Sequence, residues 1–330
     1  MTWGIYIHVP FCLRKCPYCD FYSIEDLSLL SSWKDALIRE TAMRAESVPG
    51  AVFDTVYLGG GTPSVPKPSE MEQILQAAHR SFSILPDAEI TMEANPGTIT
   101  EESLAEYRSA GVNRINMGVQ SFNDDNLAFL GRIHSAGQAA EALHAAKRAG
   151  FDNIGLDLIY GLPGQNKKSW QKDLTAAAAF SPSHISCYML TFEPGTKMAA
   201  DKEAGRFEPL SEDRVSAMFI QASKFLSGLG FEHYEISNFA ASKAARSGHN
   251  RKYWQNVPYI GLGPAAHSYV EPERSWNFRS VEDYIEAIAD NRLPTEGAEH
   301  LTPSQMMIEA IYLGLRQAEG IDIFAFEKRP

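Results

Sequence analysis

Apolar segments alternate with amphipathic segments along most of the chain, and this alternation predicts strands that are each followed by a helix. The predicted strands are short and mostly apolar, and they span 4–9, 54–58, 88–93, 113–119, 153–159, 184–190 and 231–236. Helix-like stretches lie between them, at 32–46, 69–82, 101–109, 138–149, 168–179 and 211–228. Strands that alternate with helices in this way form parallel sheets, so the sequence predicts an α/β fold.

A recurring junction marks where helices end and strands begin. The segment 109–115 resembles 148–154 and, more loosely, 228–234, because each contains a helix end, a glycine suited to the left-handed conformation and an apolar strand. At the other helix ends, Thr100 is a predicted N-cap, and 69–72 (Ser-x-x-Glu) is a predicted capping box. About six such units can close partly into a barrel or lie open as a doubly wound sheet. The pattern does not decide between the two.

The last third of the chain is less regular. Residues 240–300 are rich in aromatic side chains, and Pro303 opens a predicted helix that Gly320 ends. We therefore divide the chain into a core at 1–235, an aromatic-rich segment at 236–300 and the start of a C-terminal helical region at 301–330.

Composition and charge say little about the fold, but they exclude some classes of function. Hydrophobic residues make up 44% of the 330, and charged residues 22%, which is typical of a globular protein with a sizeable core. The net charge of −11 argues against nucleic acid as a partner, because binding to a phosphate backbone needs a basic surface. No apolar run reaches the roughly 18 residues of a membrane span, and no signal-peptide pattern is found. We therefore expect a cytoplasmic protein without a membrane span.

Three of the four cysteines lie in a short loop directly after the first predicted strand. Cys12, Cys16 and Cys19 have the spacing C-x3-C-x2-C. Three thiols cannot all pair as disulfides, but they can bind one metal centre, and Pro17 favours an open loop because it disfavours helical backbone at Cys16. One interpretation is a structural zinc site with His8 as the fourth ligand. We favour a four-iron cluster with one open iron, since zinc sites usually contain paired C-x2-C units.

This cysteine loop after a first strand resembles the radical S-adenosylmethionine (SAM) superfamily. The resemblance implies a partial (β/α)6 barrel with a C-terminal extension, whose winged-helix-like domain is expected to be truncated here. It also implies that Cys12, Cys16 and Cys19 hold a [4Fe–4S] cluster, that SAM chelates its fourth iron, and that flavodoxin or ferredoxin donates electrons. The run 59–63 (Gly-Gly-Gly-Thr-Pro), which alone would be an ordinary turn, resembles the superfamily element that contacts the SAM amino group.

Polar residues interrupt three of the apolar strands. Glu93, Gln120 and Asp157 lie in or at the ends of the third, fourth and fifth predicted strands. Each would be costly to bury alone, so each is either satisfied by a neighbouring helix end or part of a shared ligand site. Their common position near the ends of parallel strands favours the shared site.

The segments around these residues resemble the oxygen-independent coproporphyrinogen oxidase branch of the superfamily. By that resemblance, Tyr6, Gly60 and Glu93 contact cluster-bound SAM. The resemblance also implies that the same cavity is lined by Tyr18, Gly61, Thr62, Gln120, Arg132 and Asp157.

A late motif, 249–254 (His-Asn-Arg-Lys-Tyr-Trp), indicates a second ligand. Imidazole is a common axial haem ligand, and Tyr253 and Trp254 offer flat apolar surface, although a lone histidine between glycine and asparagine is more often a loop-capping residue. The motif resembles the haem-associated motif of the HemW group, the haem-chaperone relatives of the oxidase. That resemblance implies haem contacts by His249, Asn250, Tyr253 and Trp254. His267, in the glycine-rich stretch that follows, is a second candidate ligand.

Two departures from the oxidase pattern favour the HemW-like assignment. The oxidase carries a fourth cysteine where this chain has Phe21, and it has an N-terminal extension before the first strand. The resemblance therefore implies a chaperone that binds haem, a [4Fe–4S] cluster and SAM, and that transfers haem to an unknown acceptor protein. The alternatives are an oxygen-independent coproporphyrinogen III dehydrogenase and a radical SAM enzyme with another substrate.

Overall fold

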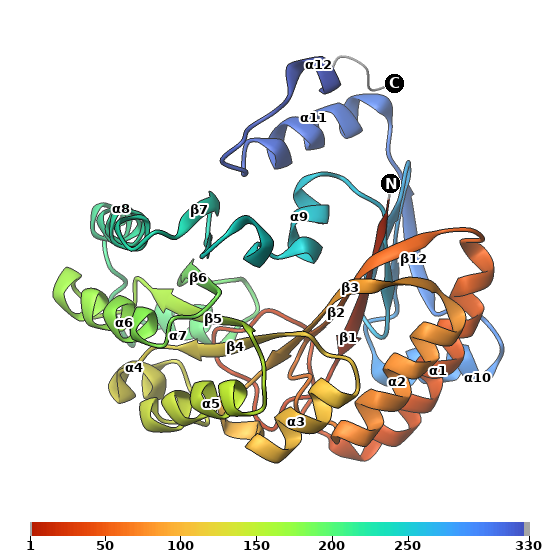
Figure 1. Cartoon of the computed structure of the whole chain (residues 1–330), viewed down its shortest axis with the longest axis horizontal. Coiled ribbons are helices and arrows are strands. Elements are labelled where there is room, and N and C mark those ends of the chain that lie inside the picture. Colours follow the sequence, from red (N-terminus) through yellow and green to blue (C-terminus); the bar gives the residue numbers. More distant parts are fainter. Residues whose placement is uncertain (1, 327–330) are drawn as a thin grey trace.

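One twelve-stranded sheet organises residues 2–326, the part of the chain that the computed structural model describes (Figure 1). Its strand order is β12-β11-β10-β9-β1-β2-β3-β4-β5-β6-β8-β7. The strands are β1 (Trp3–Val9), β2 (Val52–Gly60), β3 (Ser83–Ala94), β4 (Arg114–Gln120), β5 (Asn153–Tyr160), β6 (His184–Met189), β7 (Glu232–Glu235), β8 (Asn238–Ala240), β9 (Tyr259–Leu262), β10 (His267–Val270), β11 (Glu273–Asn277) and β12 (Thr295–His300).

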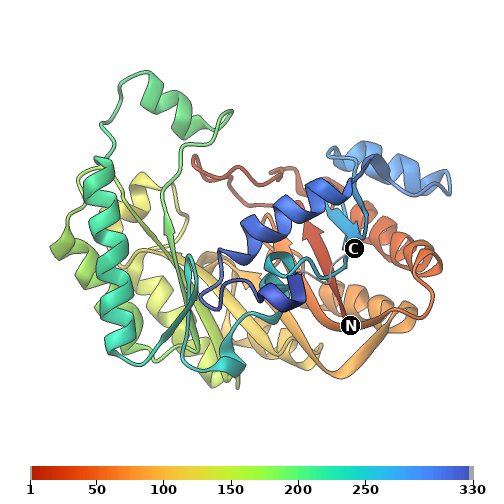
Figure 2. The same ribbon diagram turned by 90° about the horizontal axis from the view of Figure 1, so that it is seen from above.

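The helices lie on both sides of this sheet. They are α1 (Leu30–Ser47), α2 (Pro68–Ser81), α3 (Glu101–Ser109), α4 (Asp124–Phe129), α5 (Ala136–Arg148), α6 (Lys167–Ala179), α7 (Lys197–Glu203), α8 (Glu212–Gly228), α9 (Gly248–Trp254), α10 (Val281–Ala289), α11 (Pro303–Gly314) and α12 (Ile323–Phe326). Helices α1, α2, α3 and α5 form a row on one face, and α9 and α11 lie on the opposite side (Figure 1). Figure 2 shows α11 lying across the molecule above α9, which it contacts.

Strands β1 to β6 are parallel and follow one another in sequence order, as expected for six βα units. The sheet does not close: β9 extends it beyond β1 in parallel, and β8 extends it beyond β6 antiparallel. The predicted partial barrel is therefore confirmed as an open α/β sheet of this type. The third copy of the recurring junction departs from the pattern, because the strand at 231–236 becomes the antiparallel edge hairpin β7–β8.

Residues 236–300 complete this sheet on both edges. Their strand β8 pairs with β6, and their strand β9 pairs with β1. The aromatic-rich segment is thus continuous with the core sheet, and the division of the chain at 235 and 300 stays a prediction.

Local capping explains most helix starts. The hydroxyl of Thr100 accepts a hydrogen bond from Ser103 N, which confirms the predicted N-cap of α3. The predicted capping box at 69–72 is wrong, because α2 begins at Pro68 and the backbone N–H of Lys67 donates to the carboxylate of Glu70. Proline favours this earlier start, since its fixed φ suits the first helical position.

The core fills the space between the sheet and the outer helices. Trp33 of α1 and Trp170 of α6 are fully buried in it. Burial of this apolar surface fixes the register of β1 to β6 and so fixes where their carboxyl ends lie. Within residues 2–326, none of the helices combines the length and the apolar character that a membrane crossing requires.

Candidate functional site

The cysteine loop leaves the carboxyl end of β1 and packs against two other motifs. Cys12 is buried, and its Sγ lies 3.3 Å from Oγ1 of Thr62 in the glycine run. The guanidinium of Arg132 donates from Nη1 to Sγ of Cys16 over 3.4 Å. Cys19 is half-buried, and its N–H donates to the carbonyl of Cys16. All three thiols are free, and the contacts of Cys12 and Cys16 place Thr62 and Arg132 beside the cysteine loop. Their assignment to a cluster and SAM stays a prediction.

The glycine run passes directly under the cysteine loop. The N–H of Gly61 donates to Val9 O over 2.8 Å, and the N–H of Thr62 donates to Phe11 O over 2.7 Å. A Cβ on Gly61 would lie only 2.7 Å from Phe11 O, so any side chain there would push the two loops apart. Close packing of the cysteine loop therefore already requires glycine at 61, whether or not the run also contacts a ligand.

Both ring nitrogens of His8 have partners within the protein, so His8 is not available as a zinc ligand. Its Nδ1 lies 3.0 Å from the Tyr6 hydroxyl, and its Nε2 lies 2.9 Å from Tyr22 O. Burial lowers the pKa of His8 to about 4, so the ring is neutral. Among residues 2–326, no three His, Cys, Asp or Glu side chains lie close enough together to hold a single metal ion. A four-iron cluster makes a different demand, because each cysteine binds a different iron of the cluster.

Glu93 and Asp157 lie on β3 and β5, the two neighbours of β4 in the sheet. The Tyr57 hydroxyl donates to Oε1 of Glu93 over 2.7 Å, and Nδ2 of Asn116 donates to Oδ2 of Asp157 over 2.8 Å. Burial raises the pKa of Glu93 to about 7; the bond from Tyr57 opposes this shift, and the Asp157 charge adds to it. Burial also raises the pKa of Asp157. Neither carboxylate forms an ion pair within residues 2–326, although the charges of Arg132 and Arg114 act on Asp157, so both carboxylates are suited to a positively charged or hydroxyl-rich ligand.

Gln120 and Arg132 lie beside each other above Gly118. A Cβ on Gly118 would lie 2.8 Å from Nε2 of Gln120 and 3.3 Å from Nη2 of Arg132. Gln120 ends β4 with a φ of 68°, a left-handed conformation that non-glycine residues adopt at an energetic cost. Nη1 of Arg132 also donates to the Tyr18 hydroxyl over 3.4 Å, and its Nη2 donates to Gly118 O over 2.8 Å.

Three buried polar atoms beside the cysteine loop have no hydrogen-bond partner within the described part of the chain and are available to a ligand. Oε1 of Gln120, Nε of Arg132 and Oδ1 of Asp157 are buried and have no hydrogen-bond partner among residues 2–326. Each such atom costs free energy unless something else binds it. These three belong to the residues that the sequence assigned to SAM, and they lie on the same side of the sheet as the cysteine loop, which Arg132 contacts. The chemistry of the donors and acceptors fits a small zwitterionic ligand next to a thiolate-bound cluster.

The late motif forms helix α9, which is fastened to β1, β2 and β3. The N–H groups of Gly248 and His249 donate to the carboxylate of Glu89, and Nζ of Lys252 lies 2.6 Å from the carboxylate of Asp54. His249 is fully buried, with Nδ1 at 2.9 Å from Oγ1 of Thr55. These contacts explain why the backbone of the motif is fixed against the sheet.

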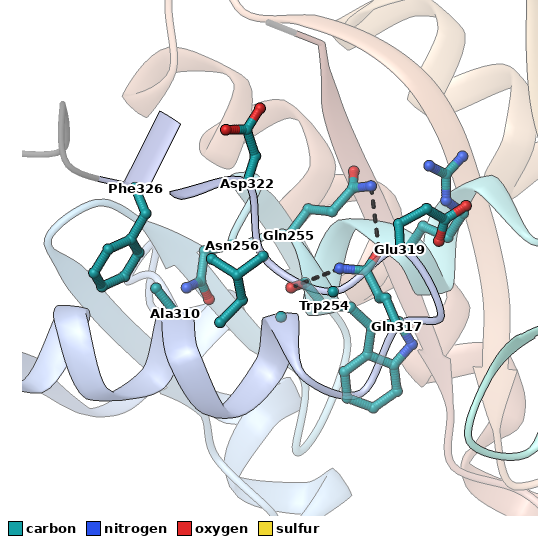
Figure 3. Close-up of a pocket in the computed structure, with 12 residues that line it drawn as sticks. Trp254, Gln255, Asn256, Ala310, Gln317, Glu319, Asp322 and Phe326 are labelled. Carbon is teal, nitrogen blue, oxygen red and sulfur yellow. Dashed lines mark hydrogen bonds between the residues drawn. The ribbon is translucent and has the colours of Figure 1, made fainter. Parts of the chain in front are cut away.

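The motif residues after His249 diverge. The Tyr253 hydroxyl lies 2.8 Å from Nε2 of His249, whereas the Trp254 indole packs under the Arg316 guanidinium, 4.7 Å from the ring centre. Figure 3 shows Trp254 facing a cavity of about 270 Å³ between α9 and the segment that follows α11. Asn250 makes a helix-capping contact through its own N–H to Ser247 Oγ. The four predicted haem residues therefore do not line one cavity.

The comparisons with known proteins agree with this arrangement. Residues 6–177 match the family model of the radical SAM superfamily. A protein of Synechocystis named "Heme chaperone HemW" is 37% identical over 97% of this chain and 79% of its own length. The Bacillus subtilis protein of the same name is 33% identical over 98% of this chain and 86% of its own length. The chain belongs to the HemW family of the radical SAM superfamily.

The solved structure of Escherichia coli coproporphyrinogen III oxidase, HemN, has the same fold. Its TM-score is 0.86 over 99% of this chain and 78% of that chain, at 23% identity. Membership of the HemW family confirms the assignment made from the cysteine loop, the glycine run and the late motif. The likeness to HemN extends that assignment to the fold.

Several residues that belong to the site of this HemW family member carry no sequence signal. Tyr57 and Asn116 hold the two buried carboxylates, yet they lie in strands with ordinary apolar patterns. The alternation of side chains along a strand gives one signal for Asn116, because it places this polar residue on the inward face of a parallel strand. Nothing local distinguishes Tyr57.

Proposed function

We propose that this protein is a cytoplasmic haem chaperone that holds haem together with a SAM-bound [4Fe–4S] cluster and passes the haem to an acceptor protein. The observation that carries the proposal is identity of 33–37% over nearly the whole chain with relatives named as heme chaperones. The buried polar atoms beside the cysteine loop support the cofactor part of the proposal.

Cys12, Cys16 and Cys19 would hold the cluster, and the polar residues near β3, β4 and β5 would hold SAM. The cluster, when bound, supplies an electron and an open iron for SAM. Glu93 is suited to the SAM amino group, because the N–H groups of that amine could donate hydrogen bonds to its carboxylate. Asp157 and Gln120 are suited to ribose hydroxyls, and Arg132 to a carboxylate, since a guanidinium binds that group with charge-assisted hydrogen bonds.

The surroundings of the cysteine loop affect whether its thiols ionise. Burial raises the pKa of Cys19 to about 11, which disfavours a free thiolate until a metal centre compensates the charge. Arg132 next to Cys16 supplies a positive charge at the same place. We propose an electron donor such as flavodoxin or ferredoxin as a partner and assign the cluster and SAM a controlling role in haem transfer.

Anaerobic reconstitution followed by haem titration tests the proposal. Reconstituted protein should contain about four iron and four sulfide per chain, should bind haem, and should release it to apomyoglobin at a rate that depends on SAM. Protein that carries a single zinc, or that leaves the haem spectrum unchanged, would contradict it.

The dehydrogenase alternative is tested in the same preparation. The position of the fourth cysteine of the oxidase is Phe21, whose side chain is 67% exposed and so is not held in the core. We expect no protoporphyrinogen from coproporphyrinogen III with SAM and dithionite. Its formation would favour the enzyme over the chaperone.

A further inference from the structure

A second cavity, larger than the one that Trp254 lines, is lined by Tyr253. It has a volume of about 640 Å³, within the range of cavities that hold cofactors. Its walls come from β1, the end of the cysteine loop, α9 and the strands β9 to β11. The residues that matter below are Tyr6, Asp20, Phe21, Tyr253, Tyr259, His267, Trp276, Arg279 and Glu296.

The wall of this cavity is largely aromatic. The rings of Tyr253 and Tyr259 meet edge to face with centres 4.7 Å apart. Trp276 is half-buried on β11, and Phe21 projects at the rim. Flat π surface of this kind suits a planar macrocycle.

His267 is the histidine that this cavity leaves accessible. It begins β10, is exposed, and pairs across the sheet with Trp276, with ring centres 5.9 Å apart. Within residues 2–326, neither of its ring nitrogens has a hydrogen-bond partner. His249 differs in both respects, because it is fully buried and both of its ring nitrogens have partners.

Charged groups lie at the edges of the same cavity. Arg279 is exposed, with its guanidinium carbon 5.6 Å from the centre of the Tyr22 ring, and it forms no ion pair with the residues that the structure describes. Two carboxylates, Asp20 and Glu296, also line the cavity. A guanidinium without a carboxylate partner is suited to an incoming propionate, and the carboxylates disfavour a propionate next to them.

We infer that haem binds in this aromatic cavity with its iron on His267 and a propionate on Arg279, while His249 acts by holding Tyr253 in the cavity wall. The inference rests on the proposed haem-chaperone function and names the ligand that this function leaves open. His249 is then a positioning residue, and Tyr253 is the one motif residue that faces the haem.

Titration with ferric protoporphyrin IX tests the assignment in the full chain. Wild type, His267→Ala and His79→Ala are compared, because His79 is an exposed histidine on α2, away from the cavity. We expect His267→Ala to weaken binding at least about tenfold and to lose the Soret maximum of histidine-ligated haem, and His79→Ala to match wild type. Imidazole added to His267→Ala should restore that maximum, since it replaces the missing ligand.

The outcomes separate this inference from the proposed function. Wild type that binds no haem would overturn both. Wild type and His267→Ala with the same affinity and the same Soret maximum would overturn the inference alone. His249→Gln that loses the histidine-ligated spectrum, while His267→Ala keeps it, would also overturn it.

The propionate contact has its own matched pair of variants. Arg279→Gln should weaken haem binding, and Asp20→Asn should strengthen it, because the two changes remove opposite charges from the same cavity. With haem dimethyl ester as the probe, both effects should vanish. Equal effects on the diacid and the ester would overturn the propionate assignment.

Discussion

The hydroxyl of Tyr253 lies 2.8 Å from Nε2 of His249, and this contact closes the inner face of the late motif. The other ring nitrogen faces Thr55 at 2.9 Å, so the imidazole has no nitrogen left for a metal. Burial lowers the pKa of His249 to about 3, with the Lys252 charge acting in the same direction, and the ring is neutral at physiological pH. The motif that marks the family thus fixes a helix and presents a tyrosine.

Loss of the Tyr253 hydroxyl should destabilise the fold. Tyr253→Phe leaves a ring nitrogen of His249 buried without a partner, which costs about 1–3 kcal/mol. Urea denaturation of the ligand-free protein measures this cost. Tyr312→Phe is the control, because the Tyr312 side chain is exposed on α11. Equal midpoints for Tyr253→Phe and wild type would mean that the bond contributes nothing.

Stability of the ligand-free protein should fall with rising pH because of Glu93. Its pKa is about 7 in the folded state against an ordinary value of 4.5, so the folded protein binds the proton more tightly than the unfolded chain does. Free energy of unfolding is therefore lost as pH rises from about 4.5 to above 7, by up to about 3 kcal/mol. Glu93→Gln should remove this slope and be more stable than wild type at pH 8.

The comparison is made between pH 4.5 and pH 8 by thermal or urea unfolding. The difference between Glu93→Gln and wild type should shrink towards pH 4.5, where Glu93 is protonated in the folded state and half protonated in the unfolded chain. A constant difference across this range would contradict the raised pKa.

Substitution of the three loop cysteines should remove the cluster, whereas substitution of the fourth cysteine should not. Reconstituted Cys12→Ala, Cys16→Ala and Cys19→Ala should lose most of their iron and sulfide, because each removes one thiolate ligand. Cys187→Ala should keep both, since Cys187 is buried within β6 and has no part in the loop. Iron and sulfide assays with the visible spectrum measure the result, and a comparable loss in Cys187→Ala would count against the loop as the cluster site.

Asp157→Asn should change stability and SAM affinity in opposite directions. The change removes a buried charge with an unpartnered oxygen, so the ligand-free protein should be as stable as wild type or more so. SAM affinity of the reconstituted protein should fall about tenfold or more, because a hydrogen bond to a charged group is lost. Equilibrium dialysis with labelled SAM measures the affinity. The exposed Asp152→Asn is the matched control, and unchanged affinity in Asp157→Asn would remove this residue from the site.

A buried carboxylate in α1 should support the wall of the aromatic cavity, because it bonds to Asn277, which lines that cavity. Glu40 is fully buried and accepts hydrogen bonds from Tyr284, Asn277 and the N–H of Gly263, so it joins α10, β11 and the turn before His267. Glu40→Ala should destabilise the protein by about 3–5 kcal/mol, because it leaves the Tyr284 hydroxyl and the Gly263 N–H without their acceptor and removes the carboxylate that pairs with Arg44. Glu72→Ala, on exposed α2 surface, should have little effect. Unfolding midpoints of both variants provide the check.

Most of the correct predictions came from motifs whose residues are close together in the sequence. The cysteine loop and the glycine run are short segments whose spacing reports their packing, and the structure joins them through Cys12 and Thr62. The alternation of apolar and amphipathic segments predicted β1 to β6 because each unit buries its own face.

The rest depended on contacts that no local pattern reports. Trp276, Arg279 and Phe21 come from separate segments, and only the antiparallel strands after β9 bring them to one cavity. The sequence predicts the strand at 231–236 but not β8, which lies between β6 and β7 and pairs antiparallel with both, because a helix end followed by glycine and an apolar run gives no sign of the hairpin. The late motif indicated haem, but its spacing could not tell that His249 points inward and Tyr253 outward.

Tyr6 links the aromatic cavity to the residues around Glu93. Its ring lines that cavity and stacks on the ring of Tyr57, whose hydroxyl donates to Glu93. If an occupant of the cavity shifts the Tyr6 ring, the energy of binding a ligand beside Glu93 changes, and thermodynamic reciprocity makes the two influences equal in size.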